Sequence, residues 1–151
     1  GGGLCQISSL LFWMFLHTPL TIVERHAHAV ESIPPTDGDL PSGTDATVTE
    51  GWLDLKVKNE TDRPFQIEIT FADGYMIGRI LSDAQLPCAY EIYNGSVVYY
   101  RERGRVYQES SVERRTTDKQ TGAVEETHLY RTTSEIGYPL PDDIEIMEKG
   151  V

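Results

Sequence analysis

The sequence has few of the features that place a protein in a specialised class. It contains only two cysteines, Cys5 and Cys88, among 151 residues, which is too few for a scaffold built on disulfides. Its longest apolar run extends only from Leu10 to Leu16, whereas a membrane-spanning helix needs about 20 apolar residues. We therefore expect one globular domain with no transmembrane segment in this region.

Basic residues are also scarce. The chain has 13 Lys and Arg residues against 24 Asp and Glu residues, so its net charge is −11 at pH 7. A surface this negative repels the phosphate backbone of a nucleic acid and disfavours docking on anionic lipid. Nucleic acid is therefore not an expected partner.

An initiator methionine is missing as well. The chain opens on Gly1-Gly2-Gly3, which predicts a fragment truncated at its N-terminus. A signal peptide would lie upstream of Gly1, so the fragment does not report its own compartment.

The first element that the sequence predicts is a helix over residues 4–16. Its apolar residues recur close to the helical period, and its second half is apolar on nearly all sides. Such a helix is expected to be the central element of the core. Pro19 ends it, because a proline pushes the preceding Thr18 toward extended backbone.

Strands are predicted for the rest of the chain, starting with residues 20–28 and 47–58. Asp73-Gly74 and Asn94-Gly95 are hairpin turn signals, and strands are expected over 106–116 and 124–132. Residues 31–45, rich in proline, glycine and aspartate, form a loop long enough for a binding or lid role. The expected class is α+β, with one N-terminal core helix followed by a mostly antiparallel β meander.

Cys5 is the first candidate for chemistry. It lies at the start of the predicted helix, where the helix dipole and unpaired amides favour a thiolate over the free thiol. The same amides, together with Gln6, could hold an oxyanion. The alternative is a small buried residue that packs where the helix begins.

Two histidines form the second candidate group. A spacing of two along a strand would place Glu24, His26 and His28 on one face. Either imidazole could act as a base, or the two could share a metal ion. The alternative is a row of hydrogen-bonding polar groups at the end of a strand.

Asp45 and Asp54 are the candidate partners for a histidine. Asp45 follows the Gly43-Thr44 turn, and Asp54 alternates with two leucines along a predicted strand. Each could instead be an ordinary turn residue or part of a solvated strand face. The chain order of Cys, then His, then Asp is that of papain-type and transglutaminase-like thiol enzymes, but a triad is defined by geometry and not by order.

Three blocks of sequence resemble the VanW family of bacterial proteins. The blocks are Gly1-Gly2-Gly3-Leu4-Cys5-Gln6-Ile7-Ser8, Val23-Glu24-Arg25-His26-Ala27-His28, and Gly43 to Val48 followed by Leu53 to Phe65. The resemblance implies a family domain over residues 1–140, followed by an acidic tail over 141–151. It also implies an accessory role in glycopeptide (vancomycin) resistance and cell-wall metabolism, in the cytoplasm or at the cell envelope. Because Gln6, Ser8 and Arg25 lie inside these blocks, they are expected to bind substrate.

Two functions remain open at this point. In the first, Cys5 is the nucleophile, His26 or His28 the base and Asp54 or Asp45 the orienting acid of an enzyme that hydrolyses or transfers a cell-wall amide. In the second, the chain is a non-catalytic module that binds peptidoglycan, its precursor or a resistance partner. A metal site at the histidines is a weaker third option, and no cofactor is expected.

Overall fold

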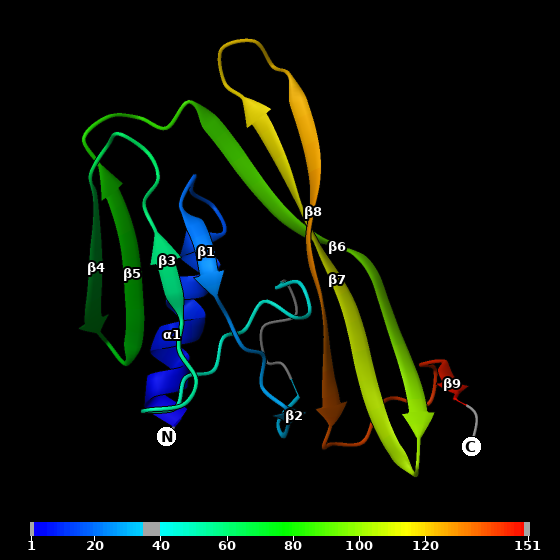
Figure 1. Cartoon of the computed structure of the whole chain (residues 1–151). Helices are drawn as coiled ribbons and strands as arrows, with labels where there is room; N and C mark the ends of the chain where they lie inside the picture. The colour runs from blue at the N-terminus through cyan, green and yellow to red at the C-terminus, as the bar shows by residue number, and fades with distance from the viewer. Residues whose placement is uncertain (1, 35–39, 150–151) are drawn as a thin grey trace.

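A computed structural model of the chain describes residues 2–34 and 40–149 (Figure 1). In this part of the chain one helix of 14 residues accompanies nine strands. The fold is therefore largely β, and the α+β class expected from the sequence is wrong. The elements are α1 (Gly2–Phe15), β1 (Thr21–Glu24), β2 (Val30–Glu31), β3 (Lys56–Lys58), β4 (Phe65–Ala72), β5 (Tyr75–Ser82), β6 (Cys88–Glu102), β7 (Arg105–Asp118), β8 (Val124–Ile136) and β9 (Ile146–Glu148).

The largest sheet has five strands in the order β2-β8-β7-β6-β9. Its three long central strands form an antiparallel meander, while the short edge strands β2 and β9 pair in parallel with β8 and β6. The expected meander is thus only the middle of a mixed sheet. Strand β9 comes from the segment expected to be an acidic tail, and it lies beside Tyr99 to Arg101.

Asn94-Gly95 does not form the hairpin turn that its sequence predicts. Strand β6 runs through it, and the register with β7 shifts between Asn94 and Val97. A Cβ added at Gly95 would lie 2.8 Å from side-chain atoms of Ser111 and Glu113, so a larger residue here would displace these side chains of β7. The Asn94 amide donates to the backbone carbonyls of Ser42 and Ser111, which explains why this pair marks a bulge and not a turn.

Asp73-Gly74 does form the predicted hairpin turn, between β4 and β5. Both residues have positive φ, 52° and 79°, as a two-residue turn of this kind requires. The hairpin packs on the helix at Gly78, where an added Cβ would lie 2.7 Å from the Met14 side chain. The hairpin therefore covers one side of α1, as Figure 1 shows.

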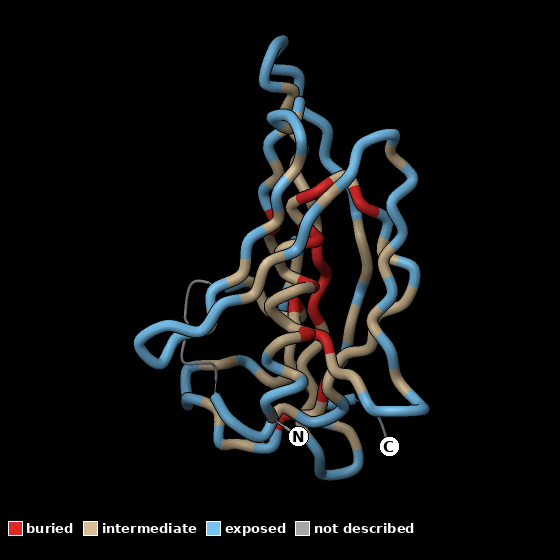
Figure 2. The backbone as a smooth tube through the Cα atoms, turned by 90° about the vertical axis from the view of Figure 1, so that its left-hand side faces the viewer, coloured by how far each residue is buried: buried red, intermediate tan, exposed pale blue. Residues whose placement is uncertain are grey.

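The core lies where α1 meets the large sheet. Phe12 of the helix and Leu16, the residue just after its end, pack with Ala46, Ile92 and Val112, and all five are buried. Buried segments gather along the middle of the molecule in Figure 2, with exposed strands on both sides. The expectation that the helix is the central core element is therefore confirmed, although the helix begins and ends slightly earlier than the predicted 4–16.

The two strands expected over 20–28 and 47–58 are much shorter in the structure. Strand β1 ends at Glu24, and β3 covers only three residues, with an isolated bridge between Thr49 and Leu53 before it. The backbone from Arg25 to His28 is therefore not a strand. Part of the expected loop over 31–45, residues 35–39, lies outside the described residues.

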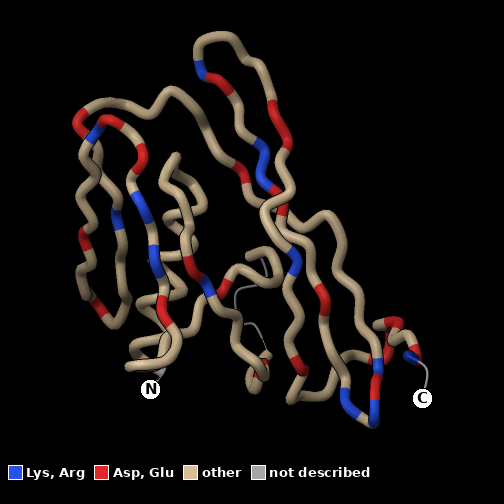
Figure 3. The backbone as a smooth tube through the Cα atoms, viewed as in Figure 1, with Lys and Arg blue, Asp and Glu red and all other residues tan. Residues whose placement is uncertain are grey.

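Acidic and basic residues are interleaved along the strands of the large sheet, as the colours in Figure 3 show. Many form cross-strand ion pairs, such as Arg115 with Glu91 and Glu126. Exposed pairs of this kind contribute little each, but they keep like charges apart in a strongly acidic chain. Of the helices described, none is long and apolar enough to cross a membrane.

Candidate functional site

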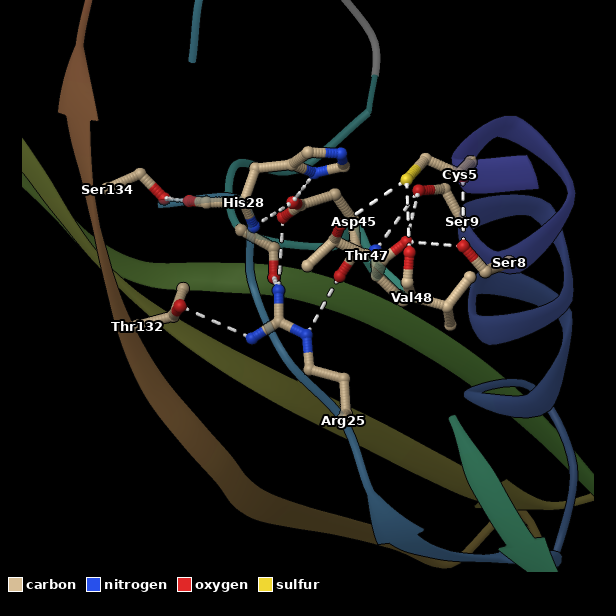
Figure 4. Close-up of polar contacts among 12 residues, drawn as sticks. Cys5, Ser8, Ser9, Arg25, His28, Asp45, Thr47, Val48, Thr132 and Ser134 are labelled. Atoms are coloured by element: carbon tan, nitrogen blue, oxygen red, sulfur yellow. Dashed lines mark hydrogen bonds and ion pairs between the residues drawn. The ribbon is translucent and has the colours of Figure 1, made fainter. Parts of the chain in front are cut away.

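Cys5 lies in the first turn of α1, against the segment that follows Asp45 (Figure 4). Its Sγ is 3.3 Å from the Thr47 hydroxyl and 3.9 Å from the Val48 carbonyl oxygen. The residue is only partly buried. The sulfur is therefore tethered by polar neighbours and is not sealed among hydrocarbon side chains.

Asp45 holds His28 by both its backbone and its ring. The His28 amide donates to Asp45 Oδ2 at 2.9 Å, and His28 Nδ1 lies 2.5 Å from the same oxygen. A carboxylate only accepts, so Nδ1 carries the proton and the opposite ring nitrogen, Nε2, is left as a base. Ser134 of β8 anchors the segment further by donating to the His28 carbonyl at 2.7 Å.

Arg25 supports Asp45 from behind. Its guanidinium donates to Asp45 Oδ1 at 3.1 Å and to the Asp45 backbone carbonyl at 2.8 Å. The same group donates to the Gly43 carbonyl and to Thr132. These bonds engage the guanidinium within the protein and support a positioning role for Arg25, while its expected role in binding substrate stays a prediction.

Two aromatic rings flank this guanidinium. Its central carbon lies 5.2 Å from the centre of the Phe12 ring and 4.7 Å from that of Tyr130, which is within cation–π range. The Tyr130 hydroxyl donates to the Gly43 carbonyl at 2.6 Å. Arg25 therefore links the core helix, the large sheet and the turn that carries Asp45.

The turn before Asp45 depends on glycine. Gly43 has φ +80°, and an added Cβ would lie 2.5 Å from the Thr132 side chain. This tight approach to β8 lets one carboxylate reach both Arg25 and His28. A tight glycine turn packed on the sheet thus positions Asp45, and the only sign of this in the sequence is that Asp45 follows Gly43-Thr44.

The electrostatics at Cys5 favour the thiolate. The hydrogen bond from the Thr47 hydroxyl is the largest cause, the Val48 backbone adds to it, and together with His28 they outweigh partial burial and lower the pKa of Cys5 to about 7. The direct hydrogen-bond partners of the sulfur are Thr47 and Val48, so His28 acts on it at longer range. Figure 4 shows the imidazole and the sulfur turned toward one another.

The pKa of His28 moves in the complementary direction. Burial by itself would lower it, but the bond to Asp45 and the neighbouring Cys5 outweigh burial and raise the pKa above its usual value. A thiol with a lowered pKa beside an imidazole with a raised one favours a thiolate–imidazolium pair near neutral pH. The structure thus brings Cys5, His28 and Asp45 together.

His26 and Asp54 lie elsewhere. His26 Nε2 is 2.9 Å from Glu24 Oε2, and Glu24 also accepts from Lys56 of β3. Asp54 is exposed and accepts a hydrogen bond from the amide of the next residue, Leu55. The expectation of Glu24, His26 and His28 on one strand face is wrong, because the strand ends at Glu24 and the chain turns the two histidines to different partners.

The remaining candidates have different surroundings. Gln6 is exposed. Ser8 is buried, and its hydroxyl donates to the backbone carbonyls of Cys5 and Ala46, which ties α1 to the Asp45 segment. Ser8 thus has a structural explanation for its place in the first sequence block.

Sequence reasoning missed Thr47 and Ser134. Thr47 lies inside the Gly43–Val48 block, and this position could have identified it. Ser134 lies on a strand more than a hundred residues from His28, and no local sequence pattern indicates its contact. Across residues 2–34 and 40–149, no group of three or more His, Cys, Asp or Glu side chains is arranged to hold a metal ion.

Comparison with known proteins gives a consistent result. The family model described as "VanW like protein" matches residues 1–81. The chain is 46% identical over 149 residues, 98% of its length, to the Vancomycin B-type resistance protein VanW of Enterococcus faecalis. It is 39% identical over 77 residues to the uncharacterized protein YoaR of Bacillus subtilis. The chain spans 54% of the first relative and 24% of the second, and no solved structure matches it.

Proposed function

The chain belongs to the VanW family, and on that premise we propose that it is a thiol enzyme acting on amide bonds of the cell wall. Cys5 is the nucleophile, His28 the general base and acid, and Asp45 the group that orients His28. We further propose that the chain shares the association with vancomycin resistance that the name of its Enterococcus faecalis relative states. The observation that carries the proposal is the set of three side chains meeting at one place, with the imidazole held between a carboxylate and a thiol.

In the first step the Cys5 thiolate attacks the carbonyl carbon of the amide. A carbon–sulfur bond forms, and the carbonyl oxygen takes up the negative charge. The first amides of α1 lack partners within the helix, so they support an oxyanion near the sulfur. When the intermediate collapses, the carbon–nitrogen bond breaks and the His28 imidazolium gives its proton to the leaving amine.

In the second step a water molecule or an acceptor amine attacks the thioester. His28 Nε2 accepts the proton from the attacking group, the new carbon–oxygen or carbon–nitrogen bond forms, and the Cys5 thiolate leaves. Asp45 keeps the ring in the required tautomer by accepting from Nδ1 throughout. Arg25 keeps the carboxylate in place and touches no reacting atom.

Alkylation by iodoacetamide tests the proposal. In a Cys88→Ser background Cys5 is the only thiol, and its pKa of about 7 gives much more thiolate at pH 6 than a free thiol of pKa about 8.5 has. The nucleophilicity of a thiolate falls with its pKa, which leaves an expected rate about fivefold above that of N-acetylcysteine. Mass spectrometry of the alkylated peptide identifies the site.

A cellular experiment completes the test. In bacteria that carry the full-length protein, Cys5→Ala is expected to abolish its contribution to vancomycin resistance, while Cys88→Ser retains it. The proposal of a thiol enzyme would be refuted if Cys5 were alkylated no faster than the free thiol and Cys5→Ala retained full function.

A non-catalytic binding module is the second candidate. The observation that favours it is the tether on the sulfur, because a thiol bonded to Thr47 and Val48 can also serve as a structural link between α1 and the following loop. In that case Cys5→Ser, which keeps the hydroxyl bond to Thr47, retains function in cells. The enzyme predicts that Cys5→Ser is as inactive as Cys5→Ala.

A further inference from the structure

A groove of about 700 Å³ lies along α1 and includes residues that neighbour Cys5, although Cys5 itself does not line it. Leu4 and Ser8, on either side of Cys5 in the helix, line it, and so does Val48, whose carbonyl oxygen lies 3.9 Å from the sulfur. The rest of the groove runs between α1 and residues 49–57. A substrate whose carbonyl group reaches Cys5 therefore has this groove as the adjoining surface.

The helix side of the groove is apolar. It is formed by Leu4, Ile7, Leu11 and Phe15, and Leu4 is 52% exposed. On the opposite side Trp52 is 77% exposed, in the turn closed by the Thr49–Leu53 bridge. A tryptophan and a leucine that face water within one groove are typical of a surface that binds an apolar group.

The same groove carries an excess of negative charge. Glu24, Glu50 and Asp54 line it, against one cation, Lys56. The Lys56 ammonium is paired with Glu24 at 3.0 Å, whereas Glu50 and Asp54 form no ion pair within the described part of the chain. Two carboxylates near an apolar surface attract a cationic group and repel an anionic one.

We infer that this groove binds the acyl side of the substrate and selects a peptide with a bulky apolar residue and a positively charged side chain. The inference rests on the proposed function and deepens it, since it names the substrate class of the Cys5 site. Trp52 and the helix leucines contact the apolar residue, while Glu50 and Asp54 attract the cation. The carbonyl that follows is presented to the thiolate.

Two matched peptide probes test this selectivity. Acetyl-Lys-Leu and acetyl-Glu-Leu chloromethyl ketones differ only in the charged side chain, and both alkylate a thiolate as the sulfur–carbon bond forms and chloride leaves. Each rate is divided by the iodoacetamide rate of the same variant, which corrects for thiol reactivity. The lysyl probe is expected to react about tenfold faster than the glutamyl probe, a difference of about 1.4 kcal/mol.

Matched variants localise the effect. Glu50→Gln/Asp54→Asn is expected to bring the ratio of the two rates close to one, while Asp142→Asn/Asp143→Asn, which removes the same charge from an exposed turn near the C-terminus, leaves it unchanged. Trp52→Ala is expected to slow both probes several-fold. Phe71→Ala, an equally exposed aromatic on the β4–β5 hairpin outside the groove, has no such effect. A ratio near one in the parent protein, or a ratio that survives Glu50→Gln/Asp54→Asn, overturns the inference.

A binding experiment without the Cys5 thiol distinguishes a failure of the groove from a failure of the proposed enzyme. Calorimetric titration of Cys5→Ser with acetyl-Lys-Leu amide and acetyl-Glu-Leu amide measures binding alone. If Cys5 is inert to iodoacetamide but the lysyl amide binds more tightly in a manner that depends on Glu50 and Asp54, the enzyme fails and the groove stands. If Cys5 is reactive but neither experiment shows a preference for lysine, the inference about the groove is wrong and the proposal of a thiol enzyme is retained.

Discussion

Two histidines that lie two residues apart in this chain each pair with a carboxylate, and the two pairs differ in their surroundings. His26 with Glu24 and His28 with Asp45 both join a ring nitrogen to a carboxylate oxygen, at 2.9 and 2.5 Å, and their imidazoles are similarly exposed, 38% and 35%. The first pair belongs to the small β1–β3 sheet, where Lys56 completes it. In the second pair, the largely buried Arg25 contacts the carboxylate and the Cys5 thiol lies near the imidazole. An imidazole–carboxylate pair therefore acquires a candidate function only from its neighbours.

The largest expected difference between the two pairs concerns their supporting cations. The Arg25 side chain is only 10% exposed, so Arg25→Gln removes the cation that pairs with the Asp45 carboxylate and is expected to lower the free energy of unfolding by about 3 kcal/mol. Lys56→Gln removes an exposed cation and is expected to change stability within experimental error. Urea unfolding followed by tryptophan fluorescence measures both. Equal losses of stability in the two variants would show that Arg25 does not hold the Asp45 carboxylate in place.

The thiol in front of the second pair provides the next test. Thr47→Val removes the largest cause of the lowered pKa of Cys5, so the midpoint of iodoacetamide alkylation against pH is expected to move upward from about 7. Thr49→Val, a neighbouring exposed threonine, is the control. An unchanged midpoint in Thr47→Val would contradict the role given to this hydroxyl.

The two histidines are then compared directly. His28→Ala is expected to slow alkylation of Cys5 at pH 6, because loss of the imidazole raises the pKa of the thiol. The shift is smaller than that of Thr47→Val, since His28 is a smaller cause. His26→Ala, which removes the partner of Glu24, should leave the rate unchanged. If only His26→Ala slowed the alkylation of Cys5, the assignment of His28 as the base would be wrong.

The smallest effect is expected at the first pair, in acid. The hydrogen bond from His26, followed by that from Lys56, lowers the pKa of Glu24 to about 2 from its ordinary value of 4.5. Because the folded pKa is the lower one, this contribution to stability is present above pH 4.5 and is lost as pH falls toward 2. Glu24→Gln should therefore lose less stability than the parent protein over this window. Glu125→Gln serves as the control. If stability falls equally with pH in all three proteins, the Glu24 pair does not contribute to stability in the way proposed.

Local signals in the sequence predicted several parts of the fold well. The apolar periodicity around Phe12 and Leu16 predicted a core helix, and Asp73-Gly74 predicted a tight hairpin. Both depend on neighbours close in the chain, where backbone geometry is decided by a few residues. The α+β class is wrong because one helix of 14 residues accompanies nine strands in the described part of the chain, so the sheets dominate the fold.

Asn94-Gly95 shows why similar signals can fail. The pair has the same turn chemistry as Asp73-Gly74, but its amide is bonded to Ser42 and to β7, and β6 continues through it. A residue more than fifty positions away decides between turn and bulge. No pattern within the strand contains that information.

The sequence by itself determined the family blocks, the helix that presents Cys5 in its first turn, and a short list of imidazoles and carboxylates. Only the tertiary structure decided that His28 and Asp45, and not His26 and Asp54, approach the thiol. The physical reason is that β1 ends at Glu24, so the alternation of side chains along a strand stops before the two histidines. From there their directions are set by Arg25, packed between Phe12 and Tyr130, and by the tight turn at Gly43 against β8.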